Sequence, residues 1–183
     1  MKFQTVLHLG YPKTGTKTLQ NGLFENIDSI SFLGKSAFSS EMRQVMETIR
    51  LYDGVEFSEI ECQKLFDDVI SEVDQSTSTI LISDEDITTP DMFNRRLADR
   101  RVVAERIKKI LNPDKILVVL RSQMTIIPSL YATVSGTTPS ACTQRAFEKN
   151  LEREYCNNLN GLFSAINYDK ILRMYEQYFG KEN

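Results

Sequence analysis

The chain has 183 residues, of which 41% are hydrophobic and 26% are charged, and its net charge is −3 at pH 7. These proportions match ordinary globular domains and exclude a wholly disordered chain, and no apolar run reaches the roughly 18 residues that a membrane-spanning helix needs. The acidic balance argues against a general nucleic-acid binder, because such proteins usually carry a basic surplus.

Short apolar runs alternate with longer helical patterns along the chain, with Gly, Pro and Asn between them. The apolar runs that predict strands are residues 3–9, 29–33, 79–82 and 115–120, and the last of them, KILVVL, is the clearest buried strand. The helical patterns begin near Thr16 and cover residues 40–51, 58–73, 90–111 and 168–179.

This alternation predicts an α/β fold, a three-layer α/β/α domain with a mainly parallel sheet of about four or five strands. Ligands of such sheets bind beyond the carboxyl ends of the strands. Three polar segments directly follow predicted strands: residues 10–18, residues 84–86 and Arg121. We therefore expect them to share one edge of the sheet.

The three cysteines, Cys62, Cys142 and Cys156, are far apart in the sequence and form no CxxC pair. Neither a disulfide framework nor a cysteine zinc site is expected, and with a single histidine the chain offers no zinc constellation. No secretory signal is visible at the start of the sequence. These features predict a cytoplasmic location.

The segment Gly10–Thr18 (GYPKTGTKT) lies between a predicted strand and helix, where a phosphate-binding loop belongs. Gly15 allows a tight turn, backbone N–H groups at the helix start attract anions, and Lys13 adds a cation. The nucleotide-triphosphatase pattern GxxxxGK[ST] fails at one position, because Thr16 follows Gly15 and Lys17 comes one residue late. The alternative is an ordinary strand-to-helix turn.

Arg121 ends the predicted strand at 115–120, and Ser129 follows eight residues later, with Tyr131 beyond it. A guanidinium group can grip a phosphate with two hydrogen bonds, and a serine hydroxyl can add another. On its own, an arginine in this position is as readily a surface ion-pair partner.

The string at residues 11–16 (YPKTGT) resembles the 5′-phosphosulfate loop, P-K-[ST]-G-T-T, of sulfotransferases that use 3′-phosphoadenosine 5′-phosphosulfate (PAPS). Residues 115–131 resemble the 3′-phosphate segment of the same family. The resemblance implies a P-loop-like sulfotransferase fold with PAPS as co-substrate, adenosine 3′,5′-bisphosphate as product and no metal. Lys17 departs from the family, which has a second threonine there. The donor-binding residues that the resemblance implies are Pro12, Lys13, Thr14, Gly15, Thr16, Lys17, Thr18, Arg121 and Ser129.

The acidic segment Asp84-Glu85-Asp86 follows the predicted strand at 79–82. In a nucleotide triphosphatase these carboxylates would hold magnesium. The sulfotransferase resemblance implies instead that Glu85 is the general base, with Asp84 as the next candidate, and that Lys13 and Glu85 are the catalytic residues. A third interpretation is that the segment caps a helix.

Two further features are expected to be structural. His8 lies inside the first predicted strand and is expected to be a hydrogen-bonded strand histidine. The basic run that includes Arg100 and Arg106 is expected to be a solvated helix face.

The expected function is transfer of a sulfuryl group from PAPS to a hydroxyl or amine of an acceptor. Relatives in the resembling family are longer and carry a later basic, glycine-containing segment that closes over the 3′-phosphate, and nothing like it follows Arg121. We therefore expect a single sulfotransferase-like domain over residues 1–183 that lacks this segment. The alternatives are a P-loop kinase or ATPase that uses Asp84 and Glu85 with magnesium, and a nucleotide-binding remnant without activity.

Overall fold

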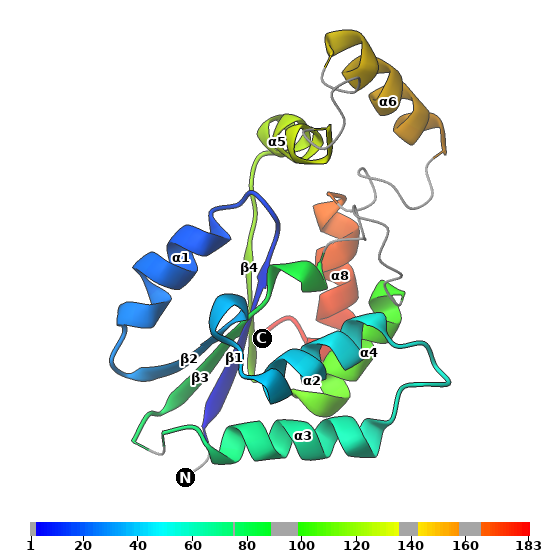
Figure 1. The fold of residues 1–183 in the computed structure, drawn as a ribbon. Helices are drawn as coiled ribbons and strands as arrows, with labels where there is room; N and C mark the ends of the chain where they lie inside the picture. The colour runs from blue at the N-terminus through cyan, green and yellow to red at the C-terminus, as the bar shows by residue number, and fades with distance from the viewer. Residues whose placement is uncertain (1–2, 75, 89–98, 136–142, 158–165) are drawn as a thin grey trace.

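A computed structural model describes residues 3–74, 76–88, 99–135, 143–157 and 166–183. These residues form an α/β fold around one four-stranded, all-parallel sheet with the strand order β2-β3-β1-β4 (Figure 1). The strands are β1 (Gln4–Gly10), β2 (Ile30–Gly34), β3 (Thr79–Ser83) and β4 (Lys115–Val119). All four strands predicted from the sequence are confirmed, with ends that differ by at most one residue.

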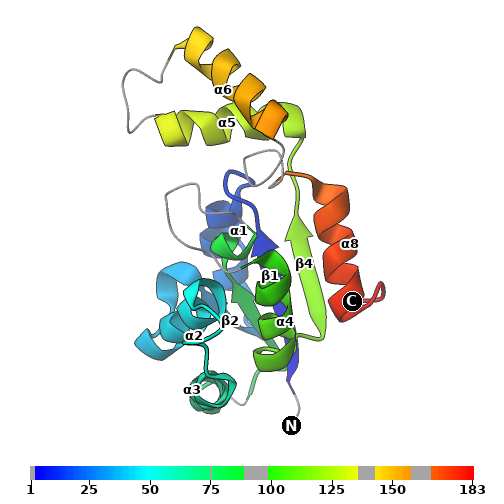
Figure 2. The ribbon, with the colours of Figure 1, turned by 90° about the vertical axis from the view of Figure 1, so that its right-hand side faces the viewer.

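Helices cover both faces of the sheet, as the alternating pattern predicts (Figure 2). Helix α1 (Thr16–Gly22) lies on one face. The opposite face is covered by α2 (Ser40–Leu51), α3 (Glu59–Ser71), α4 (Arg100–Ile110) and α8 (Tyr168–Phe179). Short 3-10 turns follow α1, β2 and β3: η1 (Phe24–Asn26), η2 (Lys35–Ala37) and η3 (Glu85–Ile87). The three-layer α/β/α arrangement is therefore confirmed.

The main core lies between the sheet and the layer of α2, α3, α4 and α8. Alternate side chains of β1 and β3 point into it, and Leu7, Leu9, Ile80 and Ile82 are at most 1% exposed. Helix α2 packs its apolar stripe, which includes the fully buried Ile49, against them.

The strand register places the carboxyl ends of β3, β1 and β4 beside one another. His8 pairs with Ser83 of β3, and Gly10 pairs with Val119 of β4. The segments that follow these three strands therefore emerge at one edge of the sheet. The first strand and the strand at 115–120 thus belong to the same parallel sheet, as the predicted fold requires, and they are direct neighbours in it.

Strand β4 is less buried than its apolar sequence predicts. Leu117 is 39% exposed and Leu120 is 42% exposed. The reason is topological: β4 is one of the two edge strands of the described sheet, and an apolar run alone does not distinguish an edge strand from a central one. Its outer edge meets the end of the chain, where the Ile116 amide donates to the Asn183 carbonyl over 2.9 Å.

Helices α5 (Gln123–Ser135) and α6 (Gln144–Asn157) lie beyond the carboxyl ends of the strands (Figures 1 and 2). They contact each other through the rings of Tyr131 and Phe147, whose centroids are 4.7 Å apart. No helix in the described ranges is long and apolar enough to cross a membrane.

The basic run around α4 is only partly the solvated face that the sequence predicts. Arg106 is 4% exposed, and its guanidinium donates to the carbonyl oxygens of Ile49 and Tyr52, over 3.2 and 2.7 Å. It also lies over the Phe57 ring, 4.0 Å from the centroid. Arg106 thus caps the end of α2, where the last carbonyl groups have no partner within the helix. The first part of the helix predicted at 90–111 lies outside the described residues, and α4 itself begins at Arg100.

Candidate functional site

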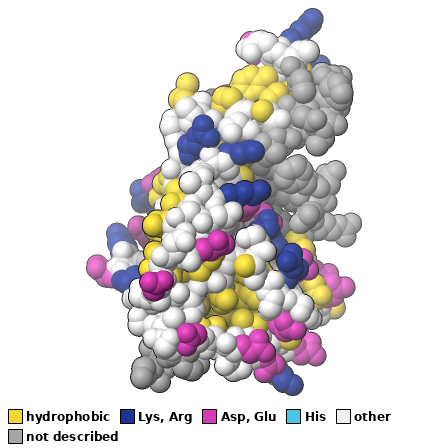
Figure 3. Space-filling view, turned by 60° about the vertical axis from the view of Figure 1, so that its left-hand side comes forward, with side chains coloured by type: hydrophobic (Ala, Val, Ile, Leu, Met, Phe, Trp, Pro, Cys, Tyr) yellow, Lys and Arg dark blue, Asp and Glu magenta, His cyan; other side chains and the backbone are white. Residues whose placement is uncertain are grey.

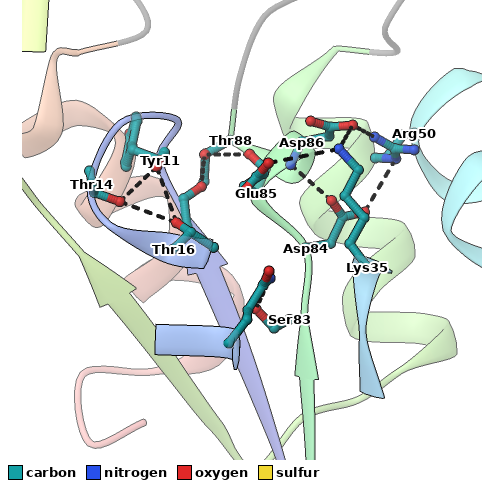
Figure 4. A network of polar contacts seen from close by, with 12 residues as sticks. Tyr11, Thr14, Thr16, Lys35, Arg50, Ser83, Asp84, Glu85, Asp86 and Thr88 are labelled. Atoms are coloured by element: carbon teal, nitrogen blue, oxygen red, sulfur yellow. Dashed lines mark hydrogen bonds and ion pairs between the residues drawn. The ribbon is translucent and has the colours of Figure 1, made fainter. Parts of the chain in front are cut away.

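The loop between β1 and α1 is folded around one carbonyl group. The carbonyl oxygen of Tyr11 accepts hydrogen bonds from the Thr14 amide over 3.3 Å, the Thr14 hydroxyl over 2.6 Å and the Thr16 hydroxyl over 3.3 Å (Figure 4). Two of the three threonines predicted to bind phosphate, Thr14 and Thr16, therefore also shape the loop. Thr16 is 3% exposed, so its side chain lies inside the turn.

Two residues of this loop have left-handed backbone conformations. Lys13 has φ 67° and Gly15 has φ 85°. Glycine adopts this conformation without penalty, whereas a lysine there is strained and must be held by its surroundings. Gly15 is also the residue that precedes α1, as expected for the tight turn.

Gly10 marks the point where the loop, α1 and η3 come closest together. A Cβ atom added to Gly10 would lie 2.6 Å from the Thr16 hydroxyl oxygen and 3.3 Å from Cβ of Glu85. The Thr88 hydroxyl donates to the Gly10 carbonyl over 2.6 Å. The absence of a side chain at Gly10 thus allows the acidic segment after β3 to lie against the loop after β1.

Arg121 reaches this loop from the other neighbouring strand. Its Nη1 donates to the Lys13 carbonyl oxygen over 2.8 Å, and its Nε donates to the Thr125 hydroxyl over 3.0 Å. The side chain lines a shallow pocket of about 580 Å³ between the end of β4 and the start of α8, together with Ser122 and Tyr168. The two predicted nucleotide segments, 108 residues apart, are therefore in direct contact.

The remaining predicted donor-binding residues differ in their exposure to solvent. Lys17 and Thr18 are exposed in the first turn of α1, and Pro12 is half-buried in the loop. Ser129 is half-buried near the middle of α5, the helix that follows Arg121. On the face that carries α1, Lys and Arg side chains gather toward the carboxyl ends of the strands, whereas Asp and Glu side chains gather toward the other end (Figure 3).

Glu85 is the carboxylate of the acidic segment that faces the loop (Figure 4). It opens η3, and it lies between the loop and Lys35, whose Nζ is 4.0 Å from its Oε1. Burial raises the pKa of the Glu85 carboxyl above its ordinary value, and Asp86 and Asp84 raise it further, while Lys35 and Lys17 oppose that rise. Such a carboxylate is suited to general-base chemistry.

Asp84 has a different orientation and a different role. It is 1% exposed, one of its oxygens accepts from the Asp86 amide over 2.9 Å, and the other lies 3.7 Å from Nε of Arg50. Burial raises the pKa of Asp84, against the opposing charge of Arg50. The Asp84 carboxylate thus caps the short turn η3 and points away from the loop (Figure 4). The capping interpretation concerned the helix predicted from residue 90, whose start lies outside the described residues.

Asp86 joins two cations that the sequence analysis did not identify. Its Oδ2 lies 2.6 Å from Lys35 Nζ and 2.9 Å from Nη1 of Arg50. Burial alone would raise the pKa of Asp86, but the bonds and charges of Lys35 and Arg50 lower it below its ordinary value. Lys35 directly follows β2, so the rule that placed the other segments at the carboxyl edge could also have found it. Arg50, in the last turn of α2, gives no comparable signal.

His8 lies in β1, two residues before the loop begins at Gly10, on the side of the sheet that carries α1. It is fully buried, with Nδ1 2.8 Å from the Ser83 hydroxyl, which also accepts from the Gln20 amide group over 2.8 Å. Its ring packs edge-on against Phe24 at 5.3 Å. Burial lowers the pKa of His8 from 6.5 to about 4, so the ring is neutral at physiological pH. His8 is thus a buried strand histidine, hydrogen-bonded through Nδ1 to a network that ties β1, β3 and α1 together, while its buried Nε2 has no hydrogen-bond partner among the described residues.

A scan against models of known protein families finds no match to this chain, and a search among curated proteins finds none either.

Proposed function

We propose that this chain is a sulfotransferase that moves a sulfuryl group from PAPS to a hydroxyl or amine of an acceptor. The observation that carries the proposal is the hydrogen bond from Arg121 to the Lys13 carbonyl, over 2.8 Å. It joins the two segments that resemble the donor-binding motifs of this family, one for each end of the donor. Chance resemblance in two distant segments does not require them to meet.

In this proposal the loop holds the 5′-phosphosulfate and Arg121 reaches the 3′-phosphate at the pocket beside β4. The loop offers backbone N–H groups and the exposed ammonium of Lys13. A guanidinium group can use two N–H donors on one phosphate. Ser129, on the following helix, is the second candidate ligand for that phosphate.

The transfer forms a bond between the acceptor oxygen or nitrogen and sulfur, and breaks the bond between sulfur and the oxygen that bridges to the 5′-phosphate. Lys13 stabilises the negative charge that develops on this bridging oxygen, an electrostatic role of the kind that preorganised cations fulfil. Glu85 accepts the proton of the acceptor as it attacks. Adenosine 3′,5′-bisphosphate leaves with the electron pair of the broken bond.

A P-loop kinase or ATPase is the competing function, and the orientation of Asp84 removes one of the two carboxylates that it was expected to use. Magnesium-dependent phosphoryl transfer needs a carboxylate after β3 that faces the phosphates and the ion. Asp84 is instead buried against Arg50 and caps η3. Glu85, beside the loop, fits the task of a base for an incoming acceptor.

Donor turnover tests the proposed function. The native protein is incubated with PAPS and candidate acceptors (a sugar, a phenol and a peptide amine) in the presence of a metal chelator. Release of adenosine 3′,5′-bisphosphate that depends on an acceptor, and that is lost in Lys13→Ala, is the expected result. Magnesium-dependent consumption of ATP without turnover of PAPS would support the kinase or ATPase instead. Binding of the nucleotide without turnover of any acceptor would support the remnant.

A further inference from the structure

Lys35 holds a fixed position beside the proposed base. Gly34 of β2 pairs in register with Ser83 of β3, so the two strands end level and place Lys35 beside the acidic segment. The Lys35 ammonium lies 2.6 Å from Asp86 Oδ2 and 4.0 Å from Glu85 Oε1. One cation, at the first residue after the neighbouring strand β2, thus contacts the carboxylates of both Glu85 and Asp86 (Figure 4).

Asp86, which binds Lys35, is itself held by a buried arginine. Arg50 has a side chain that is 7% exposed, and its Nη1 lies 2.9 Å from the same Asp86 oxygen that binds Lys35. The Nε of Arg50 also donates to the Met46 carbonyl within α2 over 3.2 Å. Fixing a lysine side chain costs conformational entropy, so Lys35 stays in one place only if the carboxylate that binds it is itself held in position. The contacts of Arg50 with Asp86 provide this.

The charges around Glu85 come from several elements. Lys35 from η2 and Lys17 from α1 favour its ionised form, and Asp84 and Asp86 from its own segment oppose that form. Arg50 from α2 forms ion pairs with these two aspartates. The half-buried carboxylate therefore depends chiefly on Lys35, whose charge favours the ionised form more than that of Lys17, to offset burial and two like charges.

We propose that Lys35 is a positioning residue for Glu85, fixed by Asp86, which Arg50 in turn holds, so that it keeps the Glu85 carboxylate ionised in its place beside the loop. The proposal rests on the proposed function, in which Glu85 is the general base. A base acts only in its deprotonated form, so a cation that favours this form extends activity to lower pH. Loss of Lys35 should lower turnover about tenfold on the acid limb of the pH profile and change the alkaline plateau little.

The direct test is the titration of Glu85, followed by carbon NMR of the side-chain carboxyl groups in protein labelled at glutamate, with Glu85→Gln used to assign the signal. The titration midpoint should move to higher pH in Lys35→Met and stay near the native value in Lys35→Arg, which keeps the charge. Lys64→Met removes an exposed lysine of α3 and is the matched control, with no shift expected. Lys17→Met should give a smaller upward shift than Lys35→Met.

A midpoint that is unchanged in Lys35→Met, or that moves equally in Lys35→Arg, would overturn the proposal. If Lys35→Met does not fold, as judged by circular dichroism, Lys35→Gln takes its place under the same criteria. Calorimetry of adenosine 3′,5′-bisphosphate binding to the native protein distinguishes failure of this proposal from failure of the proposed function. A shifted midpoint without such binding leaves the effect of Lys35 on Glu85 in place and contradicts the sulfotransferase function. Binding with an unchanged midpoint supports the nucleotide site and overturns the proposed role of Lys35.

Discussion

Arg121→Ala separates recognition of the 3′-phosphate from the structural role of this arginine in the loop. A guanidinium group has five N–H donors. Two hydrogen bonds of Arg121 are within the protein, to the Lys13 carbonyl over 2.8 Å and to the Thr125 hydroxyl over 3.0 Å. The side chain also lines the open pocket at the end of β4. Arg121 can therefore contact a phosphate there while it still holds the loop.

The size of the expected effect follows from these two roles. A charge-assisted hydrogen bond to the 3′-phosphate is worth about 1.5–3 kcal/mol, which corresponds to a loss of roughly 10- to 150-fold in affinity. The bond to the Lys13 carbonyl is exposed, so its loss costs about 0.5–1 kcal/mol and less than roughly tenfold in affinity. The first loss should be confined to ligands that carry a 3′-phosphate, whereas the second should affect all ligands of the loop.

Isothermal titration calorimetry with two ligands measures both losses. Adenosine 3′,5′-bisphosphate and adenosine 5′-monophosphate are titrated into the native protein, Arg121→Ala and the control Arg43→Ala, which removes an exposed arginine of α2. The native protein should prefer the bisphosphate, and Arg121→Ala should lose most of this preference. Equal weakening of both ligands, or unchanged preference, would show that Arg121 does not read the 3′-phosphate.

Three further predictions address the base, the loop and the support beneath it. Glu85→Gln should leave the affinity for adenosine 3′,5′-bisphosphate nearly unchanged and cut turnover of a proven acceptor by about 10²-fold or more, whereas Lys13→Ala should impair both affinity and turnover. Full turnover in Glu85→Gln would show that Glu85 is not the base. Gly15→Ala should lower the free energy of unfolding, measured with urea, by about 1–2 kcal/mol, because φ of Gly15 is 85°. Gly22→Ala, in helix α1 with open space around the glycine, should raise the free energy of unfolding by about 0.5–1 kcal/mol. Equal effects of the two substitutions would contradict the strained turn. The pKa of His8 falls from 6.5 to about 4 on folding, so the unfolded chain binds more protons than the folded chain in this range. The free energy of unfolding should therefore decrease as pH is lowered from 6.5 to 4, by up to about 3 kcal/mol. His8→Gln should lack this decrease, and the same pH dependence in His8→Gln and the native protein would refute the prediction.

The sheet and the convergence of its loops could be predicted because both follow from local patterns and one geometric rule. Apolar runs between glycines, prolines and asparagines define the strands, and the parallel order brings their carboxyl ends to one edge. That rule places Gly10, Glu85 and Arg121 together without any knowledge of side-chain contacts. The acceptors within the loop, above all the Tyr11 carbonyl, could not be predicted, because they depend on the backbone turn at Lys13 and Gly15.

The charge network around the base could not be predicted from the sequence, because it depends on which strands are neighbours. Lys35 and Asp86 are 51 residues apart, and they meet only since β2 lies next to β3. Arg50 and Arg106 are equally unremarkable in sequence, and each is buried by a contact with another element. The exposure of β4 has the same origin, because a strand's place in the sheet is set by the whole topology.

Nucleotide selectivity of the native protein tests the central claim most directly. Calorimetry compares adenosine 3′,5′-bisphosphate in the presence of a metal chelator with ATP in the presence of magnesium. The account predicts that the bisphosphate binds without metal, with an affinity that falls in Arg121→Ala, and that magnesium ATP binds weakly or not at all. Tight, magnesium-dependent binding of ATP with no binding of the bisphosphate would contradict it.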